Sequence, residues 1–165
     1  MIGAVLGNGP SRSAFDREGD FVIGCNIPDE EFSVDATAIC DVEIVWILRA
    51  DPFLVSVPLI ISTNVFEKLK EYKIVQHYNI IHVFKPKDWH NSAHYAAEYL
   101  LEQGCDEIHI WGCDVLFEEE ISSTTDSYIG KDYMDKSRFI KHWRWVWNDI
   151  FDKEPAKFKI YVREK

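Results

Sequence analysis

The feature that most constrains the fold is a regular series of short apolar runs separated by polar turns and helical patterns. Most of the runs are continuously apolar instead of alternating, which is typical of parallel strands that are covered on both faces. The expected strands are Ile2–Leu6, Phe21–Gly24, Ala36–Cys40, Val57–Ser62, Ile80–Phe84, Glu107–Trp111 and Phe158–Val162.

Helical patterns lie between several of these runs. The clearest is Ser92–Gln103, where Tyr95, Ala96, Tyr99 and Leu100 form one stripe and Gly104 is suited to end the helix. The other expected helices are Val42–Leu48, Val65–Tyr72 and Lys136–Phe151. Strands that alternate with helices form βαβ units. The sequence therefore predicts an α/β fold in which residues 1–165 form a single Rossmann-like domain, with a doubly wound, mostly parallel sheet flanked by helices.

Composition and charge limit the classes of partner. The chain has 165 residues, 47% of them hydrophobic, which suits one domain with a full core. Its formal net charge of −10 argues against a nucleic-acid binder, whose surface would be basic. A nucleotide ligand needs only a few local donors, so the charge leaves that class open.

The cysteines and the apolar runs indicate the cellular compartment in which we expect the protein. The four cysteines have no C-x-x-C spacing and lie in or beside apolar runs, so we expect buried, reduced thiols in a cytoplasmic protein. The first residues do not resemble a signal peptide. No apolar run approaches the ~20 residues that span a bilayer, so we expect no membrane association.

The loop "GNGPS" follows the first expected strand and contains Gly7, Asn8, Gly9, Pro10 and Ser11. Glycines allow a sharp turn and a close approach of a ligand to the main chain. Ser11 is suited to cap a following helix and leave N–H groups free for an anion. The loop matches neither the dinucleotide nor the Walker fingerprint. An ordinary tight turn accounts for the same residues, so both interpretations stay open.

Polar residues follow the next five expected strands as well. Because the carboxyl ends of parallel strands share one edge, where ligands of such sheets bind, these residues are candidates for the same site. Each also has a local interpretation as a turn or helix-cap residue. The residues are Asn26, Asp41, Thr63, Asn64, Ser92 and Asp114.

Several of these motifs, in this order, resemble two related families. The motifs are "GNGPS", "CN", Asp41, "NSAHYAAEYLLEQGCDEIHIWGCD" and "SYIG". They are similar to bacterial sialyltransferases that use CMP-sialic acid, and to the 6-hydroxymethylpterin diphosphokinase-like family. The resemblance implies a Rossmann-like sheet that binds a nucleotide over its carboxyl edge.

Resemblance to the sialyltransferases implies roles for individual residues. Nucleotide contacts would come from Asn8, Gly9, Ser11, Asn26 and Asn64, and Tyr128 would contact the departing phosphate. In that family a histidine three residues after the tyrosine is the general base, whereas this chain has Lys131 there. A lysine with a pKa near 10.4 is a poor base but a good phosphate ligand. This departure favours a phosphate-centred reaction or binding alone.

Resemblance to the diphosphokinase-like family implies a different role for two carboxylates. Asp41 and Asp114 become candidate ligands of Mg²⁺ or of a ribose. Mg²⁺ commonly takes one or two carboxylates together with substrate phosphates. A strand-ending turn accounts for Asp114 equally well.

Together these features lead to one main functional hypothesis, a nucleotide-dependent transferase. It would move a glycosyl group from a nucleotide-sugar such as a CMP-sugar, or a phosphoryl or diphosphoryl group. Asp114, Tyr128 and Lys131 are its candidate catalytic residues.

Two alternatives remain open. One is a nucleotide-binding module without catalysis, used for sequestering, sensing or assembly. The other is a structural or interaction protein that uses the helix containing Trp143, Trp145 and Trp147, which also leaves a homo-oligomer open.

Overall fold

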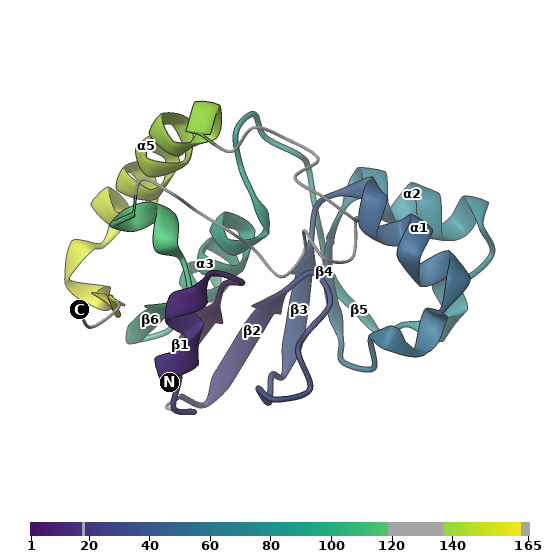
Figure 1. The fold of residues 1–165 in the computed structure, drawn as a ribbon, viewed down its shortest axis with the longest axis horizontal. Helices are drawn as coiled ribbons and strands as arrows, with labels where there is room; N and C mark the ends of the chain where they lie inside the picture. Colours follow the sequence, from purple (N-terminus) through teal and green to yellow (C-terminus); the bar gives the residue numbers. More distant parts are fainter. Residues whose placement is uncertain (18, 119–136, 163–165) are drawn as a thin grey trace.

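Seven parallel strands form one sheet in the order β5-β4-β3-β2-β1-β6-β7 (Figure 1). The structure is a computed structural model, and it describes residues 1–17, 19–118 and 137–162. The strands are β1 (Ile2–Leu6), β2 (Phe21–Cys25), β3 (Ala36–Ile39), β4 (Leu59–Ser62), β5 (Ile80–Phe84), β6 (Glu107–Trp111) and β7 (Phe158–Ile160). All seven expected strands are confirmed.

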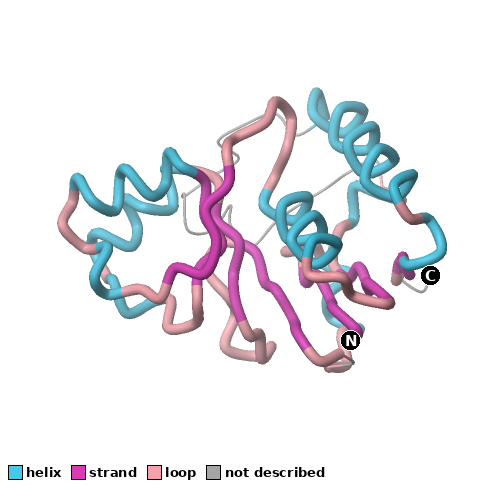
Figure 2. Tube along the Cα trace, turned by 180° about the vertical axis from the view of Figure 1, so that it is seen from behind, coloured by secondary structure: helices cyan, strands magenta, loops and turns pink. Residues whose placement is uncertain are grey.

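Helices cover both faces of the sheet, as the doubly wound prediction requires (Figure 2). On one face, α1 (Val42–Ala50) and α2 (Thr63–Glu71) pack against β3 and β4. On the other, α3 (Ser92–Glu102) packs against β1, β2 and β3, and α5 (Ser137–Lys153) packs against α3 and contributes to the same apolar cluster. The α/β fold class predicted from the sequence is therefore correct.

The side chains of β4 illustrate how both faces are filled. Ile60 belongs to the apolar cluster under α3, whereas Leu59 and Ile61 belong to the cluster under α1 and α2. All three are fully buried. Because successive side chains of a strand point to opposite faces, a strand covered on both sides must be continuously apolar. This requirement explains the pattern seen in the sequence.

The connection after β1 differs from the expectation of a helix that Ser11 caps. It forms a short 3-10 turn, η1 (Pro10–Ala14), and Ser11 lies within that turn. Phe15, which follows the turn, packs edge-on against Trp111 of β6 with 5.6 Å between ring centroids. This contact belongs to a third apolar cluster, in which loop side chains cover part of β1, β2 and β6.

Four further 3-10 turns complete the described elements, and three strands are shorter than expected. The turns are η2 (Pro52–Leu54), η3 (Val75–His77), η4 (Asp114–Leu116) and η5 (Pro155–Lys157). The fourth strand begins after Pro58, which has no N–H to give to a sheet. The third ends at Ile39 instead of Cys40, and the seventh ends at Ile160 instead of Val162.

The tryptophans of α5 divide between core and surface, because helix positions four residues apart share a face and the position between them does not. Trp147 is fully buried, and its ring stacks on Phe151 with 5.3 Å between centroids. Trp143 is partly buried against the same cluster, and its ring stacks on Phe139. Trp145 lies on the opposite side and is 65% exposed.

We predict that Trp147→Ala lowers the free energy of unfolding by about 3–5 kcal/mol, because it leaves a large cavity in the core. Trp147→Phe should cost less, because among the described residues the indole N–H of Trp147 has no hydrogen-bond partner to lose. Trp145→Ala is the control on the same helix and should change stability by less than about 0.5 kcal/mol. Urea unfolding of the three variants tests this, and equal losses at positions 145 and 147 would contradict it.

Candidate functional site

The strand order places a topological switch point between β1 and β6. Strands β2 to β5 extend from one side of β1, and β6 and β7 extend from the other. Connections therefore leave the carboxyl ends of β1 and β6 in opposite directions, and ligands of open α/β sheets bind at such points. The loops that meet here are residues 7–11 and residues 112–114, both singled out from the sequence.

These two loops are joined by main-chain hydrogen bonds. Gly7 N donates to Trp111 O at 2.7 Å, and Gly9 N donates to Gly112 O at 2.8 Å. A Cβ on Gly9 would lie 2.6 Å from the carboxyl carbon of Asp114 and 2.7 Å from Gly112 O. Gly112 itself has a φ of +68°, which favours glycine. The glycines are thus required for the loops to approach each other, a role that the sequence interpretation did not include.

Ser11 and Asp114 form the buried centre of this contact. The Ser11 amide nitrogen lies 3.3 Å from each carboxylate oxygen of Asp114, and the Ser11 hydroxyl donates to Oδ1. Asp114 is only 6% exposed. The N-cap residue of η1 is Gly9, which makes no side-chain cap bond, so the expectation that Ser11 caps it is wrong. The Ser11 N–H is bonded to a carboxylate of this chain, and Pro10 at the start of the turn is exposed.

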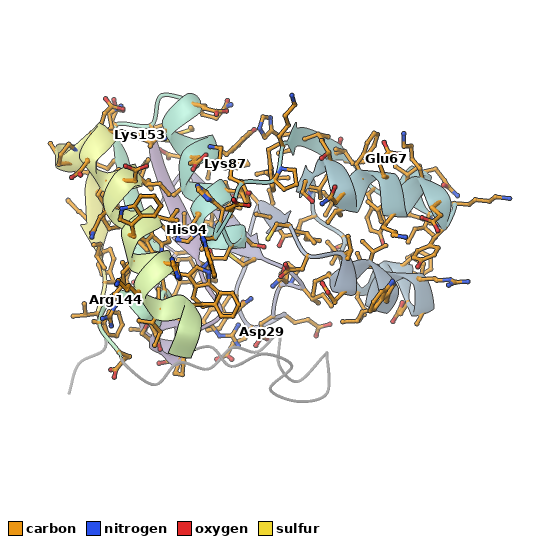
Figure 3. The ribbon with its side chains drawn as sticks, turned by 90° about the horizontal axis from the view of Figure 1, so that it is seen from above. Asp29, Glu67, Lys87, His94, Arg144 and Lys153 are labelled. Carbon is orange, nitrogen blue, oxygen red and sulfur yellow. The ribbon has the colours of Figure 1, made fainter. Side chains whose placement is uncertain are left out.

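A second cluster lies beside the first, at the ends of β2 and β3 (Figure 3 looks onto this edge). Asn26 adopts a left-handed φ of +60°, and its carbonyl oxygen accepts from the Thr37 hydroxyl at 2.7 Å. The Ser92 hydroxyl, at the start of α3, lies 3.3 Å from Asn26 Oδ1 and 3.4 Å from Cys40 Sγ. Asn8 Nδ2 donates to Cys25 O at 3.0 Å, which ties the first loop to the end of β2.

Asp41 belongs to this second cluster and has unusual surroundings for its position. It is the N-cap residue of α1, yet its carboxylate accepts no hydrogen bond from the helix. Its Oδ1 lies 3.8 Å from the Cys40 thiol, and no described lysine, arginine or histidine forms an ion pair with it. Burial, with a smaller effect of Glu43, raises the pKa of Asp41. A half-buried carboxylate with these properties can exchange a proton or receive a cationic ligand.

Burial raises the pKa of the neighbouring thiols as well, including Cys25 and Cys40. They are free cysteines, and Cys40 is half-buried whereas the other three are buried. Raised pKa values keep thiols protonated, so these side chains are poor nucleophiles.

The remaining predicted residues differ in their outcomes. Ser62, not Thr63 or Asn64, caps α2, because its hydroxyl accepts from Val65 N at 3.1 Å. Thr63 and Asn64 form the first turn of that helix, and Asn64 is exposed. Tyr128 and Lys131 lie outside the described residues.

The metal prediction receives no further support from the geometry. Within the part of the chain that the structure describes, no three His, Cys, Asp or Glu side chains form a metal-binding group. The candidate Mg²⁺ ligands Asp41 and Asp114 belong to the two different clusters.

Sequence reasoning missed the role of His94, which joins α3 to α5. His94 Nδ1 accepts from Asn91 N at 2.9 Å while His94 N donates to Asn91 Oδ1, so the two residues form a reciprocal cap. This leaves the proton on Nε2, which donates to Trp143 O at 3.2 Å. Burial, reinforced by His90, lowers the pKa of His94 to about 3. The sequence signal was Asn followed three residues later by a side chain that can accept, an unusual capping box.

Next to this cap, His90 and Lys87 both contact Glu98. His90 Nε2 lies 3.2 Å from one carboxylate oxygen, and Lys87 Nζ lies 2.8 Å from the other. Burial raises the pKa of Glu98, but these hydrogen bonds outweigh it and lower the pKa to about 2. The contacts hold the loop that precedes α3 against the helix.

Comparison of the chain with models of protein families, with curated proteins and with solved structures finds no match. Across the residues that the structure describes, no helix has the length and apolar character needed to cross a membrane.

We predict that acid weakens the fold through His94. Its folded pKa of about 3 lies below the ordinary value of 6.5, so its contribution is complete above pH 6.5 and is lost as the pH falls toward 3. The loss approaches about 1.4 kcal/mol per pH unit in this window. His94→Gln should remove this slope, whereas the matched change His77→Gln at an exposed site should keep it. Urea unfolding between pH 5 and 7 measures it, and an unchanged slope in the His94 variant would contradict the prediction.

We predict that Gly9→Ala separates the two loops. The new methyl group would overlap Asp114 and Gly112 O, at a cost of about 1–3 kcal/mol in unfolding free energy. Gly24→Ala is the control, since its Cβ would lie 3.3 Å from a methyl group of Val34 and needs only a small adjustment. Thermal unfolding compares the two variants, and equal stability would argue against a close loop contact.

Proposed function

We propose that this chain is a nucleotide-dependent transferase that binds its nucleotide at the carboxyl edge of the sheet. One observation carries the proposal. Residues from the ends of β1 and β6 meet at the topological switch point of an all-parallel sheet, and residues from the ends of β2 and β3 and the start of α3 form a second cluster beside it. This is where sheets of this class bind nucleotides. The resemblance of "GNGPS" and "CN" to the sialyltransferase and diphosphokinase-like families supports the same ligand class.

The two clusters suggest different tasks. The hydrogen bonds of Asp114 to Ser11 hold the first loop in place, which favours a positioning role for Asp114. Asp41 is better suited to proton transfer, because it is half-buried, leaves its own helix uncapped and has a raised pKa. In glycosyl transfer Asp41 would accept the proton of the acceptor hydroxyl while the nucleotide leaves with the bonding electrons. Tyr128 and Lys131 remain the proposed phosphate ligands.

Charge distinguishes the two branches of this proposal. Asp114 lies beside the loop that would hold phosphates, so a nucleotide bound there would meet a negative charge. Phosphoryl or diphosphoryl transfer overcomes this with Mg²⁺, for which Asp114 or Asp41 would supply a carboxylate. Transfer from a CMP-sugar would instead use Lys131 and need no metal.

A second candidate is a nucleotide-binding module without catalysis. The observation that favours it is the Ser11 N–H, which is bonded within the chain instead of being open toward a ligand. This candidate predicts nucleotide binding with no release of nucleotide from an activated sugar and no phosphoryl transfer.

Thermal shift assays with CMP, CDP, UDP, ADP, ATP and GTP, each with and without Mg²⁺, test the proposal. A ligand at 100 times its Kd adds about 2.7 kcal/mol of stability when it binds only the native state. Mg²⁺-independent stabilisation by CMP supports the glycosyl branch, and Mg²⁺-dependent stabilisation by ATP supports the phosphoryl branch. If none of these ligands stabilises the protein, the nucleotide proposal is overturned.

The variant Asn26→Gly sharpens this test, because glycine keeps the left-handed backbone and removes only the side-chain amide. We expect it to weaken nucleotide binding about tenfold or more, as the loss of a hydrogen bond worth about 1.5 kcal/mol would. Lys73→Gly is the matched control, since Lys73 has a φ of +59° and follows α2 at the opposite end of the sheet. Asp41→Asn should then bind nucleotide normally and lose turnover of a CMP-sugar by about 10²-fold or more.

A further inference from the structure

The connection between β5 and α3, residues 85–91, contains a strained turn. It rises above the carboxyl edge of the sheet toward the amino end of α5 (Figure 1). Trp89 has a φ of +63°, a left-handed value that is uncommon for a bulky side chain. It lies in the turn that His90 N closes by donating to Lys87 O at 3.4 Å. Backbone conformations of this kind persist only where the surrounding contacts hold them.

The ring of Trp89 makes one of these contacts. It stacks on His142 of α5, with 3.8 Å between the ring centroids and 9° between the ring planes, and its centroid lies 5.4 Å from that of Phe139. His142 is thus the titratable side chain of α5 that contacts this connection. Trp89 is still 39% exposed, so the stack attaches the turn to α5 but leaves much of the ring in water.

The imidazole of His90 makes two further contacts, and both are to hydrogen-bond acceptors. Its Nδ1 lies 2.9 Å from Asp88 O, and its Nε2 lies 3.2 Å from Oε1 of Glu98. A carbonyl oxygen has no proton to give, and Glu98 is ionised because its hydrogen bonds lower its pKa to about 2. A neutral imidazole has one N–H and can donate to one of these acceptors, whereas an imidazolium donates to both. In His94, by contrast, one ring nitrogen accepts and the other donates, which suits a neutral ring.

We propose that residues 85–91 form a pH-sensitive strap, which the doubly protonated His90 holds closed by donating to Asp88 O and to Glu98 at the same time. When His90 loses a proton, one of the two donated hydrogen bonds is lost, and that acceptor faces a lone pair of the ring instead. The strap then opens at Trp89, because the left-handed turn loses a contact that holds it.

The other groups around His90 leave Glu98 as its partner. Lys87 Nζ binds the second oxygen of Glu98 at 2.8 Å, so it shares the carboxylate without displacing the imidazole. His94, with 5.6 Å between the two ring centroids, is neutral because burial lowers its pKa to about 3. Tyr95, whose ring centroid lies 5.4 Å away, keeps its proton because burial raises its pKa to about 12. The carboxylate of Glu98 is therefore the charge that holds the second proton on His90.

The sign of the pH dependence follows from where this proton is bound. A group that is held protonated in the closed state contributes fully below its ordinary pKa, which for histidine is about 6.5, and its contribution is lost as the pH rises. We therefore expect the strap to be closed near pH 6.5 and to open at higher pH. His94 acts in the opposite direction, and its contribution is complete above pH 6.5, so the range from pH 6.5 to 9 isolates the effect of His90.

Opening of the strap reaches the candidate site through α3. The strap ends at Asn91, the N-cap residue of that helix, and Ser92 follows it with its hydroxyl 3.3 Å from Asn26 Oδ1. The contacts that close the strap lie within the chain and need no nucleotide. The strap can therefore be tested on the chain alone, and the result does not depend on the proposed function.

Hydrogen exchange of the full chain between pH 6.5 and 9, followed by NMR, tests the proposal. Each rate is divided by the intrinsic exchange rate of the same amide at the same pH. The amides of Lys87, His90 and Asn91, which donate the main-chain hydrogen bonds of the strap, should lose protection about tenfold or more, as the loss of a hydrogen bond to a charged group would. The amides of β1 should keep their protection. Constant protection in the strap, or an equal loss in β1, would overturn the proposal.

Substitutions on the strap and on α3 assign the effect to the pair. His90→Gln should show low protection of the strap at pH 6.5 and no further loss at pH 9, because its amide does not titrate. Glu98→Gln keeps the histidine but removes the charge, and it should show a smaller loss than the wild type. His77→Gln, at an exposed position, is the matched control and should keep the full loss. A full loss in His90→Gln or Glu98→Gln would overturn the proposal, and so would a loss that disappears in His142→Gln but survives in His90→Gln.

Discussion

The parallel pairing of β1 with both β2 and β6 is the interaction on which the rest of the structure depends. β1 pairs with β6 over five residues, from Ile2 opposite Glu107 to Leu6 opposite Trp111, although β6 is far along the chain. This pairing places the carboxyl ends of β1 and β6 side by side and creates the switch point. Without the β1–β6 pairing, the loops that contain Ser11 and Asp114 would not lie next to each other.

Small side chains allow α3 to lie close to the sheet and so to reach the candidate site. Ala36 and Ala38 of β3 belong to the same buried cluster as Ala93, Ala96 and Ala97 of α3. Gly3 contributes in the same way, since a Cβ there would lie 2.7 Å from Leu100 of this helix. The close packing brings Ser92 within hydrogen-bond distance of Asn26, so a property of the core determines the geometry at the edge.

The charges at the carboxyl edge of the sheet determine what a phosphate-bearing ligand would need in order to bind there. Asp41 and Asp114 place two carboxylates there, and the guanidinium of Arg12 is paired with Asp29 at 2.8 Å. A phosphate-bearing ligand needs positive charge from elsewhere, either a metal ion or a lysine such as Lys131. The raised pKa of Asp41 has the same origin, since its carboxylate loses water without gaining a basic neighbour among the described residues. Under the proposed function, nucleotide binding and proton transfer at this edge would therefore both depend on the same local charges.

The sequence by itself determined the elements and the edge that they share. Apolar periodicity is a local property, so every strand, the four helices and the gathering of Asn26, Ser92 and Asp114 at one edge followed from it. Only the tertiary structure decided which strands are neighbours and that β5 lies at an edge of the sheet. It also decided the contacts of the polar groups, since the Ser11 N–H binds Asp114 and Asp41 leaves its helix uncapped. The physical reason is that a polar group's partner and a strand's neighbour depend on segments far away in the chain. Those contacts exist only after the core has packed.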